Sequence, residues 1–321
     1  MLDLYNYKGE KPFSQKNLVN LIGYDRDDIL QILALALRLK TEKKAGIPHP
    51  LLAGRVMAMI FTKPSTRTRV SFETGLFQLG GHAMYISGGE MGLGTRETVY
   101  DVANVLGRMV DGIMIRTFAQ ADVEGLARHA GVPVINGLTD DFHPCQVLAD
   151  MLTLYEQKGT LENLRLAYVG DGNNMANSLL LITSKLGVSL TLACPAGYEP
   201  KAEILELAKE AAKASGARIE LTDDPRAAVS HADAVYTDTW ASMGQEAEQE
   251  KRARIFAPYQ VNGELMALAA KDAIFLHCLP AHRGLEVTDE VMDSPGSRVF
   301  EEAENRLHAQ KAVMALLMGQ G

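Results

Sequence analysis

The feature that most restricts the fold is an alternation of short apolar runs with longer amphipathic stretches, which passes through the chain twice. Apolar runs of strand length occur at 55–61, 82–87, 112–118 and 132–136, and again at 164–170, 189–195, 217–222, 233–238 and 273–279. Such runs separated by helices are typical of parallel sheets covered on both faces. The sequence therefore predicts an α/β fold with two doubly wound domains, each a parallel sheet flanked by helices, joined by interdomain helices.

Apolar residues at helical spacing fill the intervals between these runs. Helices are expected at 25–44, 65–80, 98–109, 124–131, 143–159, 174–187, 202–216, 226–231 and 302–318. Because the alternation restarts near the helix at 143–159, we expect one domain at 1–142, completed by the C-terminal helix at 302–318, and a second at 143–301. A length of 321 residues suits two domains of ordinary size.

Composition excludes several classes of protein. A net charge of −8 without a block of Lys or Arg gives no basic face for nucleic acid. The three cysteines are widely spaced without a C-x-x-C pair, which indicates neither a zinc site nor a disulfide framework. The chain has no apolar run of about 18 residues, and its first residues show no leader pattern. We expect a cytoplasmic protein that binds neither membrane nor nucleic acid.

The segment from Lys63 to Arg69 (KPSTRTR) leaves the first predicted strand and opens a helix. Ser65 is a good N-cap, and the free amides of a helix start favour an anion. Hydroxyl groups and two guanidinium groups within this segment add to that positive end, which suits a phosphate dianion. The alternative is a capped helix with solvated arginines. The Walker A pattern is absent.

A second group of polar residues follows later strands of the first half. Arg116 ends the run at 112–118, and His143-Pro144-Cys145-Gln146 opens a helix with His143 and Gln146 on one face. An imidazole and a carboxamide aimed at one oxygen would polarise a carbonyl group as an oxyanion hole does. Alone, His143 could equally be a helix-capping residue, and Arg116 a structural ion-pair partner.

Three loops of the second half carry further candidates. VGDGNN, at 169–174, resembles a dinucleotide turn, but Met175 stands where the third glycine belongs, so the pattern disfavours a nucleotide. Asp238-Thr239-Trp240-Ala241-Ser242-Met243-Gly244 and the charged run that follows suit either a mobile lid or a solvated loop. His277-Cys278-Leu279-Pro280 follows the last strand, where Cys278 alone would suggest a buried thiol.

Taken together, these motifs resemble those of the aspartate/ornithine carbamoyltransferases. The resemblance rests on Ser65-Thr66-Arg67-Thr68-Arg69 with Ser71-Phe72-Glu73-Thr74-Gly75, and on Arg-Thr, His-Pro-x-Gln, D-x-W-x-S-M-G and H-C-L-P at their family positions. It covers nearly the whole chain, through EAENRL in the last helix.

The resemblance implies transfer of the carbamoyl group of carbamoyl phosphate to the side-chain amine of L-ornithine, giving L-citrulline and phosphate. The implied contacts to carbamoyl phosphate are Ser65, Thr66, Arg67, Thr68, Arg116, His143, Gln146, Cys278, Leu279 and Arg306. The implied contacts to ornithine are Asn174, with Asn173 as a possible substitute, and Asp238, Ser242 and Met243. Arg67, His143, Asp238 and Cys278 are the expected catalytic residues, with Asp238 and Cys278 both candidates to accept the amine proton.

The resemblance also implies a homotrimer or a multiple of trimers, with the loop at 87–97 reaching a neighbouring subunit. The family often has Gln or His where this chain has Gly92, so Thr95 or Arg96 would have to replace that contact. We expect no metal and no organic cofactor, because positioning and electrostatics suffice for the transfer. We assign the reaction to arginine biosynthesis, although no residue distinguishes synthesis from breakdown.

Several alternative functions are less consistent with these residues than transfer to ornithine. The nearest is the same transfer to another amine such as putrescine or an N-acylornithine; putrescine lacks the carboxylate that Asn174 and the Ser-Met-Gly loop would hold. Aspartate is disfavoured by Cys278 and the same loop. A non-catalytic relative would have lost some of the four expected catalytic residues, and all four are present.

Overall fold

The computed structural model describes residues 2–94, 96–241 and 248–319, and the chain divides into two compact units. The four-stranded unit comprises Asp3–Leu152 and Glu304–Gly321, and the five-stranded unit comprises Met1–Leu2 and Thr153–Ala303. Both sheets are parallel and flanked by helices, which confirms the predicted fold class. The chain passes from one unit to the other within helices, α6 (Pro144–Lys158) and α13 (Val299–Met318).

The four-stranded unit has the strand order β2-β1-β3-β4. Its elements are α1 (Arg26–Lys44), β1 (Val56–Phe61), α2 (Thr66–Gln78), β2 (His82–Ser87), α3 (Gly88–Met91), α4 (Val99–Leu106), β3 (Gly112–Arg116), α5 (Gln120–His129) and β4 (Val134–Leu138), with the larger parts of α6 and α13. β1 and β3 are central and almost wholly buried, whereas the edge strand β2 is largely exposed. Buried central strands explain the unbroken apolar runs in the sequence.

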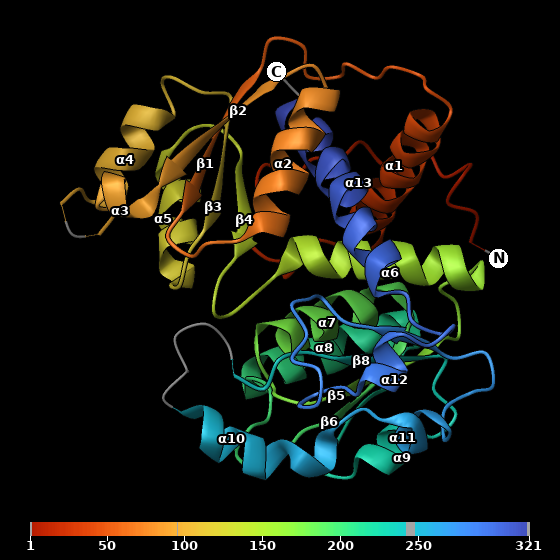
Figure 1. Cartoon of the computed structure of the whole chain (residues 1–321). Coiled ribbons are helices and arrows are strands. Elements are labelled where there is room, and N and C mark those ends of the chain that lie inside the picture. Colours follow the sequence, from red (N-terminus) through yellow and green to blue (C-terminus); the bar gives the residue numbers. More distant parts are fainter. Residues whose placement is uncertain (1, 95, 242–247, 320–321) are drawn as a thin grey trace. The chain divides into compact units, whose positions relative to one another are not determined.

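Helices cover both faces of this sheet (Figure 1). On one face, α4 and α5 pack onto the strands through a buried cluster that includes Val102, Val123, Ile113 and Ile115. On the other face lie α2 and α13, which Figure 1 draws in orange and blue. Gln78 of α2 accepts a hydrogen bond from Lys311 of α13 at 3.0 Å. This packing brings the end of the chain back to the unit that begins it.

The five-stranded unit has the strand order β7-β6-β5-β8-β9. Its elements are β5 (Arg165–Val169), α7 (Asn174–Leu186), β6 (Ser189–Ala193), α8 (Ala202–Ser215), β7 (Ile219–Thr222), α9 (Pro225–Val229), β8 (Ala234–Thr237), α10 (Gln249–Phe256), the 3₁₀ helix η2 (Ala257–Tyr259), α11 (Gly263–Met266), β9 (Ile274–Leu276) and α12 (Asp289–Met292). A buried cluster from α9, α11 and α12 packs against β5, β6, β8 and β9. The loops after β5, β8 and β9 therefore leave neighbouring strands at one edge of the sheet, where α/β folds bind ligands.

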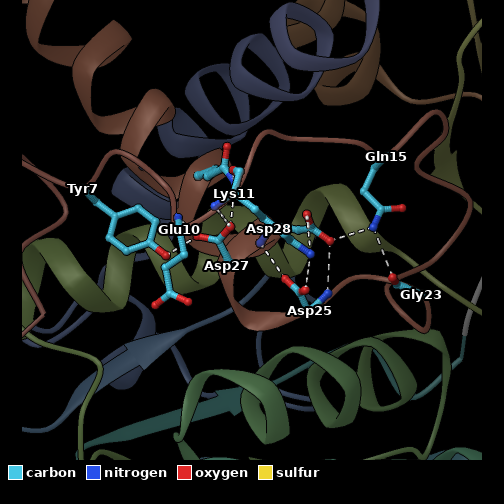
Figure 2. Close-up of polar contacts among 9 residues, drawn as sticks. Tyr7, Glu10, Lys11, Gln15, Gly23, Asp25, Asp27 and Asp28 are labelled. Carbon is cyan, nitrogen blue, oxygen red and sulfur yellow. Dashed lines mark hydrogen bonds and ion pairs between the residues drawn. The ribbon is translucent and has the colours of Figure 1, made fainter.

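The N-terminus of α1 is held by an acidic cluster, shown in Figure 2. Asp25 caps the helix and forms a capping box with Asp28, in which each side chain accepts from the other residue's backbone N–H. Asp27 accepts from the Tyr7 hydroxyl, from Glu10 N at 2.8 Å and from Gln31 Nε2 at 2.9 Å. One carboxylate thus ties the incoming N-terminal segment to the first turn of the helix.

The structure adds short helices that the sequence did not predict, namely α3, α10, η2, α11 and α12. The first residues of α10 fall in the charged run that we interpreted as a lid or a solvated loop; the run is helical from Gln249. No helix among the described residues combines the length and apolarity needed to cross a membrane.

Candidate active site

The first group of candidate residues lies at the carboxyl ends of β1 and β3. Ser65 is the N-cap of α2, and its hydroxyl oxygen accepts from Thr68 N at 3.2 Å, as predicted. The Arg116 carbonyl accepts from Thr62 N at 2.9 Å, which fixes the loop after β1 against the end of β3. Thr68 is buried, Thr66 is exposed and Arg67 is partly buried. The start of α2 therefore offers backbone amides at the same edge of the sheet as Arg116.

Arg306 of α13 is buried and joins this group. Its Nη1 donates to Gln146 Oε1 at 2.7 Å, and its Nη2 donates to Thr68 Oγ1 at 3.3 Å. Gln310 also contacts the guanidinium group, at 2.9 Å from Nη2 and 3.1 Å from Nε once its amide oxygen faces Arg306. The contacts tie the last helix to the first turn of α2, a pairing of residues 238 positions apart.

His143 is buried near the positive charges of this group. Burial lowers its pKa well below the usual value, and the positive charges of Arg306, Arg116 and Arg67 lower it further. The imidazole is therefore neutral at physiological pH and shares its surroundings with three guanidinium groups. A neutral donor among fixed positive charges can polarise a carbonyl oxygen beside a bound dianion.

Gln146 is more constrained than the sequence suggested. Its carbonyl oxygen accepts from Arg306, and its amide nitrogen donates to Asp150 Oδ1 at 2.8 Å. The contact with Asp150 orients the side chain. Donation to a bound carbonyl stays a prediction.

The second group of candidate residues lies in the five-stranded unit and begins with the loop after β5. Asn173 is the N-cap of α7, with its oxygen accepting from Met175 N and Ala176 N, while its Nδ2 donates to Asp238 Oδ2 at 2.8 Å. Asn174, the residue expected to bind ornithine, is the first residue of that helix and is largely buried. Asn173 therefore positions Asp238 and caps the helix, two contacts that the sequence did not assign to it.

Asp238 and Cys278 are in direct contact. The Cys278 thiol donates to Asp238 Oδ1 at 3.0 Å, and the same oxygen accepts from Thr239 N at 2.8 Å. Asp238 is buried after β8, and Cys278 is partly buried after β9. The two residues proposed as proton acceptors thus form one hydrogen-bonded pair.

His277 stabilises the loop after β9 through contacts of both its ring nitrogens. Its Nδ1 accepts from Leu279 N at 2.9 Å, and its Nε2 lies 3.3 Å from Glu286 Oε1. Leu279 has a φ of 56°, a conformation costly for a leucine unless its surroundings hold it. The Leu279 N–H donates to His277 Nδ1, and a contact of Leu279 with carbamoyl phosphate stays a prediction.

Asp238, His277 and Cys278 also bring three possible metal-ligand atoms within 4.8 Å of one another. However, both ring nitrogens of His277 already face partners, Leu279 and Glu286. Binding a metal through His277 would break one of these contacts. The set is better explained as a positioned thiol and carboxylate.

An ion pair at the base of the D-x-W-x-S-M-G segment was not foreseen from the sequence. Arg252 of α10 donates from Nη1 to Asp171 Oδ2 and to the Trp240 carbonyl, both at 2.8 Å. Burial raises the pKa of Asp171 to about 6, against the lowering effect of Arg252. Ser242 and Met243, which the sequence assigns to ornithine, lie outside the described residues.

Two glycines of the candidate loops have structural explanations. A Cβ at Gly172 would lie 2.2 Å from the backbone of Glu199 and Pro200, so this glycine is required by close packing of two loops rather than by a nucleotide. Gly92 is the C-cap of α3 with a φ of 67°, a left-handed conformation that glycine adopts without cost. Arg96 Nη2 donates to Met91 O at 3.4 Å, and Thr95 lies outside the described residues.

Comparison with known proteins identifies the class. The family model described as the carbamoyl-P binding domain of aspartate/ornithine carbamoyltransferase matches residues 16–156, and the one described as the Asp/Orn binding domain matches residues 162–317. The chain therefore belongs to the aspartate/ornithine carbamoyltransferase family, which confirms the resemblance of its motifs.

The most similar relatives include ornithine carbamoyltransferases. That of Caldicellulosiruptor saccharolyticus is 54% identical over 302 residues, covering 94% of this chain and 98% of the relative. The "anabolic" ornithine carbamoyltransferase of Pyrococcus furiosus is 54% identical over 304 residues, covering 95% and 96%. The solved structure of ornithine carbamoyltransferase from Pyrococcus furiosus has a TM-score of 0.94 at 52% identity and covers 97% of this chain and 99% of that one.

Proposed function

We propose that this chain transfers the carbamoyl group of carbamoyl phosphate to the side-chain amine of L-ornithine, giving L-citrulline and phosphate. The observation that carries the proposal is that three arginines, with Arg67 of α2 among them, lie close enough to the buried, neutral histidine before α6 to lower its pKa. Membership of the family and the names of the relatives support the same reaction.

Carbamoyl phosphate is a phosphate dianion that carries a polarisable carbonyl group. The amides and hydroxyls from Ser65 to Thr68, with Arg67, Arg116 and Arg306, suit the dianion. His143 is neutral and suits the carbonyl, and we assign Gln146 to the same group. We assign this substrate to residues 1–142 with the helix at 302–318, and the family model that spans 16–156 supports the assignment.

Ornithine must lose a proton before its side-chain amine can attack. A lysine-like amine has an unperturbed pKa of about 10.4, so it enters protonated. The Asp238–Cys278 pair supplies a carboxylate and a thiol in one hydrogen-bonded unit that could take this proton. We assign ornithine to residues 143–301, with Asn174, Ser242 and Met243 holding its α-carboxylate and α-amine.

The chemistry then follows from position and charge. The neutral amine attacks the carbonyl carbon, and donors at His143 and Gln146 stabilise the developing oxyanion. The attacking nitrogen then gives its second proton to a phosphate oxygen, the bond between the carbonyl carbon and the bridging oxygen breaks, and hydrogen phosphate leaves toward Arg67. Holding the two substrates in line supplies much of the rate enhancement. These side chains accomplish each step by hydrogen bonding, charge and proton transfer.

A substrate panel tests the proposal. The purified protein is incubated with carbamoyl phosphate and, in parallel, with L-ornithine, putrescine and N-acetylornithine, and the ureido product is quantified. We expect turnover with ornithine to exceed that with the other amines by at least about a hundredfold, because each alternative leaves buried polar groups unpaired. Comparable or faster turnover of putrescine or N-acetylornithine would refute ornithine as the acceptor.

We further propose a cytoplasmic homotrimer, or a multiple of trimers, that acts in arginine biosynthesis. Val70 and Phe77 of α2 and Met84 and Tyr85 of β2 are exposed apolar side chains on adjoining elements, which supports burial against another subunit. The word "anabolic" in the name of the Pyrococcus furiosus relative supports the biosynthetic direction.

A further inference from the structure

Gln310 is a fully buried polar residue of α13 that none of the family motifs includes. It lies four residues after Arg306, one turn further along the same helical face. A guanidinium group can only donate hydrogen bonds, so the Gln310 amide must turn its oxygen toward Arg306. In that orientation the oxygen accepts from Arg306 Nε at 3.1 Å and from Nη2 at 2.9 Å.

The same orientation directs the Gln310 amide nitrogen at α2. It donates to Ser71 Oγ at 2.6 Å, and the Ser71 hydroxyl in turn donates to the Arg67 carbonyl at 2.7 Å. Gln310 therefore connects Arg306 with the first turn of α2, which carries the phosphate-loop arginine. The link runs entirely through residues of the four-stranded unit.

Neutral oxygens of Gln146, Thr68 and Gln310 accept hydrogen bonds from Arg306. Gln146 Oε1 accepts from Nη1 and Thr68 Oγ1 from Nη2, while Gln310 accepts from both Nε and Nη2. A neutral acceptor orients a guanidinium group but does not offset its positive charge, whereas a carboxylate would do both. An arginine held in this way keeps its charge for an anionic ligand and loses little further freedom on binding.

We propose that Gln310 is a positioning residue that sets the Arg306 guanidinium for carbamoyl phosphate and couples it to the start of α2. This inference rests on the proposed function, because carbamoyl phosphate is the ligand that Arg306 would meet. Gln310 acts through Arg306 and Ser71 and does not itself touch substrate. Its removal therefore weakens carbamoyl phosphate binding and leaves ornithine binding unchanged.

The test replaces Gln310 with methionine, which preserves length and removes both hydrogen-bonding ends. The matched control is Gln78→Met, because Gln78 also joins α2 to α13 through a hydrogen bond to a buried cation, in that case Lys311. Steady-state kinetics should show the KM for carbamoyl phosphate raised about ten- to a hundredfold in Gln310→Met, since a hydrogen bond to a charged group is lost. The KM for ornithine should stay within about twofold in both variants, and so should the KM for carbamoyl phosphate in Gln78→Met.

A double-mutant cycle separates positioning from general destabilisation. In an Arg306→Met background, Gln310→Met should add no further increase to the KM for carbamoyl phosphate, because its target is gone. An additive increase in the double variant, or an equal increase in Gln78→Met, would overturn the inference. Should Gln310→Met fail to fold, as judged by circular dichroism, Ser71→Ala replaces it and should raise the same KM by a smaller factor; an unchanged KM would also overturn the inference.

These outcomes are distinct from failure of the proposed function. If the unmodified protein forms no citrulline, the proposed function itself is wrong. If it forms citrulline at normal rates and Gln310→Met binds carbamoyl phosphate as well as the unmodified protein does, only the positioning role is wrong.

Discussion

At the scale of single residues, the site depends on side chains whose protonation is set by their neighbours. His143 follows the helix-start pattern that the sequence predicted, but its neutrality depends on burial and on Arg306, Arg116 and Arg67. Arg306 lies 163 positions away in the chain, counted from residue 143 to residue 306. Composition and spacing name such residues, whereas only the fold reveals how they shift one another's pKa.

Arg67 gives the most direct test of the phosphate loop. Arg67→Gly should lower kcat/KM by about a hundred- to a thousandfold or more, because it removes a cation from the position where phosphate charge develops. Arg69→Gly is the matched control: Arg69 lies in the same helix but is exposed, bonds Glu73 and stacks on Tyr85. Citrulline assays measure the activity of both variants, and thermal melts show whether each is folded. Near-normal activity in Arg67→Gly would contradict the phosphate assignment.

The three thiols should differ sharply in reactivity. Burial raises the pKa of Cys145 to about 12 and also raises that of Cys194, so neither forms appreciable thiolate at pH 8. Cys278 is only partly buried and lies at the proposed site. Iodoacetamide at pH 8 should therefore label Cys278 first, with activity lost in parallel, as followed by peptide mass spectrometry. Earlier labelling of Cys145 or Cys194 would show that burial does not control reactivity here.

Several residues of the site could not have been found from the sequence. Asn173 and Asn174 are adjacent and chemically identical, so no pattern reveals that Asn173 caps α7 and bonds Asp238. Gln310 appears as one of several polar residues in the last helix, and its role depends on the approach of α2 to α13. The Asp171–Arg252 pair joins the loop after β5 to α10, 81 residues further along the chain. These contacts are tertiary and leave no local signal.

At the scale of elements, the long strands and helices were predictable because each buries a continuous apolar face. The starts of two helices were also predictable: Ser65 caps α2, and the expected acids lie at the N-cap and in the first turn of α1. Short helices such as α11 and α12 were missed. They contain only four residues each, too few to show a period, and packing against the sheet stabilises them.

The start of α1 provides an element-scale prediction. Asp27 accepts from Tyr7, Glu10, Lys11 and Gln31, so Asp27→Asn should lower the free energy of unfolding by about 1–3 kcal/mol. Hydrogen bonds lower the pKa of Asp27 despite its burial. A carboxyl group whose pKa is lower in the folded state stabilises above its unfolded pKa of about 3.9, and that stability is lost as pH falls through the folded value.

Urea unfolding at pH 7 and at pH 3 measures this contribution. The difference between Asp27→Asn and the unmodified protein should shrink at the lower pH, where the carboxylate takes up its proton. Asp25→Asn is the control, because asparagine caps a helix about as well as aspartate, and the ion pair that Asp25 forms with Lys11 is solvent-exposed, so its loss should cost little at pH 7. A destabilisation by Asp27→Asn that does not vary with pH would show that the charge has no part in the anchor.

At the scale of the whole molecule, the two parallel sheets followed from the repeated alternation in the sequence. The chain divides inside α6 and α13, and no glycine or proline interrupts either helix at those points. A continuous helix does not show in its sequence where one unit ends. The four-stranded unit thus gathers the first half of the chain with its last residues.

The proposed trimer is tested on the exposed face formed by α2 and β2. An edge strand with exposed apolar side chains normally requires a covering surface. Phe77 is 79% exposed, and Met84→Lys combined with Phe77→Lys would place two charges where another subunit should pack. Light scattering after gel filtration should show a trimer, or a multiple of one, for the unmodified protein and monomers for the double variant.

Phe300→Lys is the matched control for this experiment, because Phe300 is 69% exposed and lies outside the α2–β2 face. It should leave the mass of the assembly unchanged. Since the loop at 87–97 follows β2 directly, activity should fall together with assembly in the double variant and persist in Phe300→Lys. A monomeric unmodified protein, or a double variant that still assembles, would show that this face is not the subunit interface.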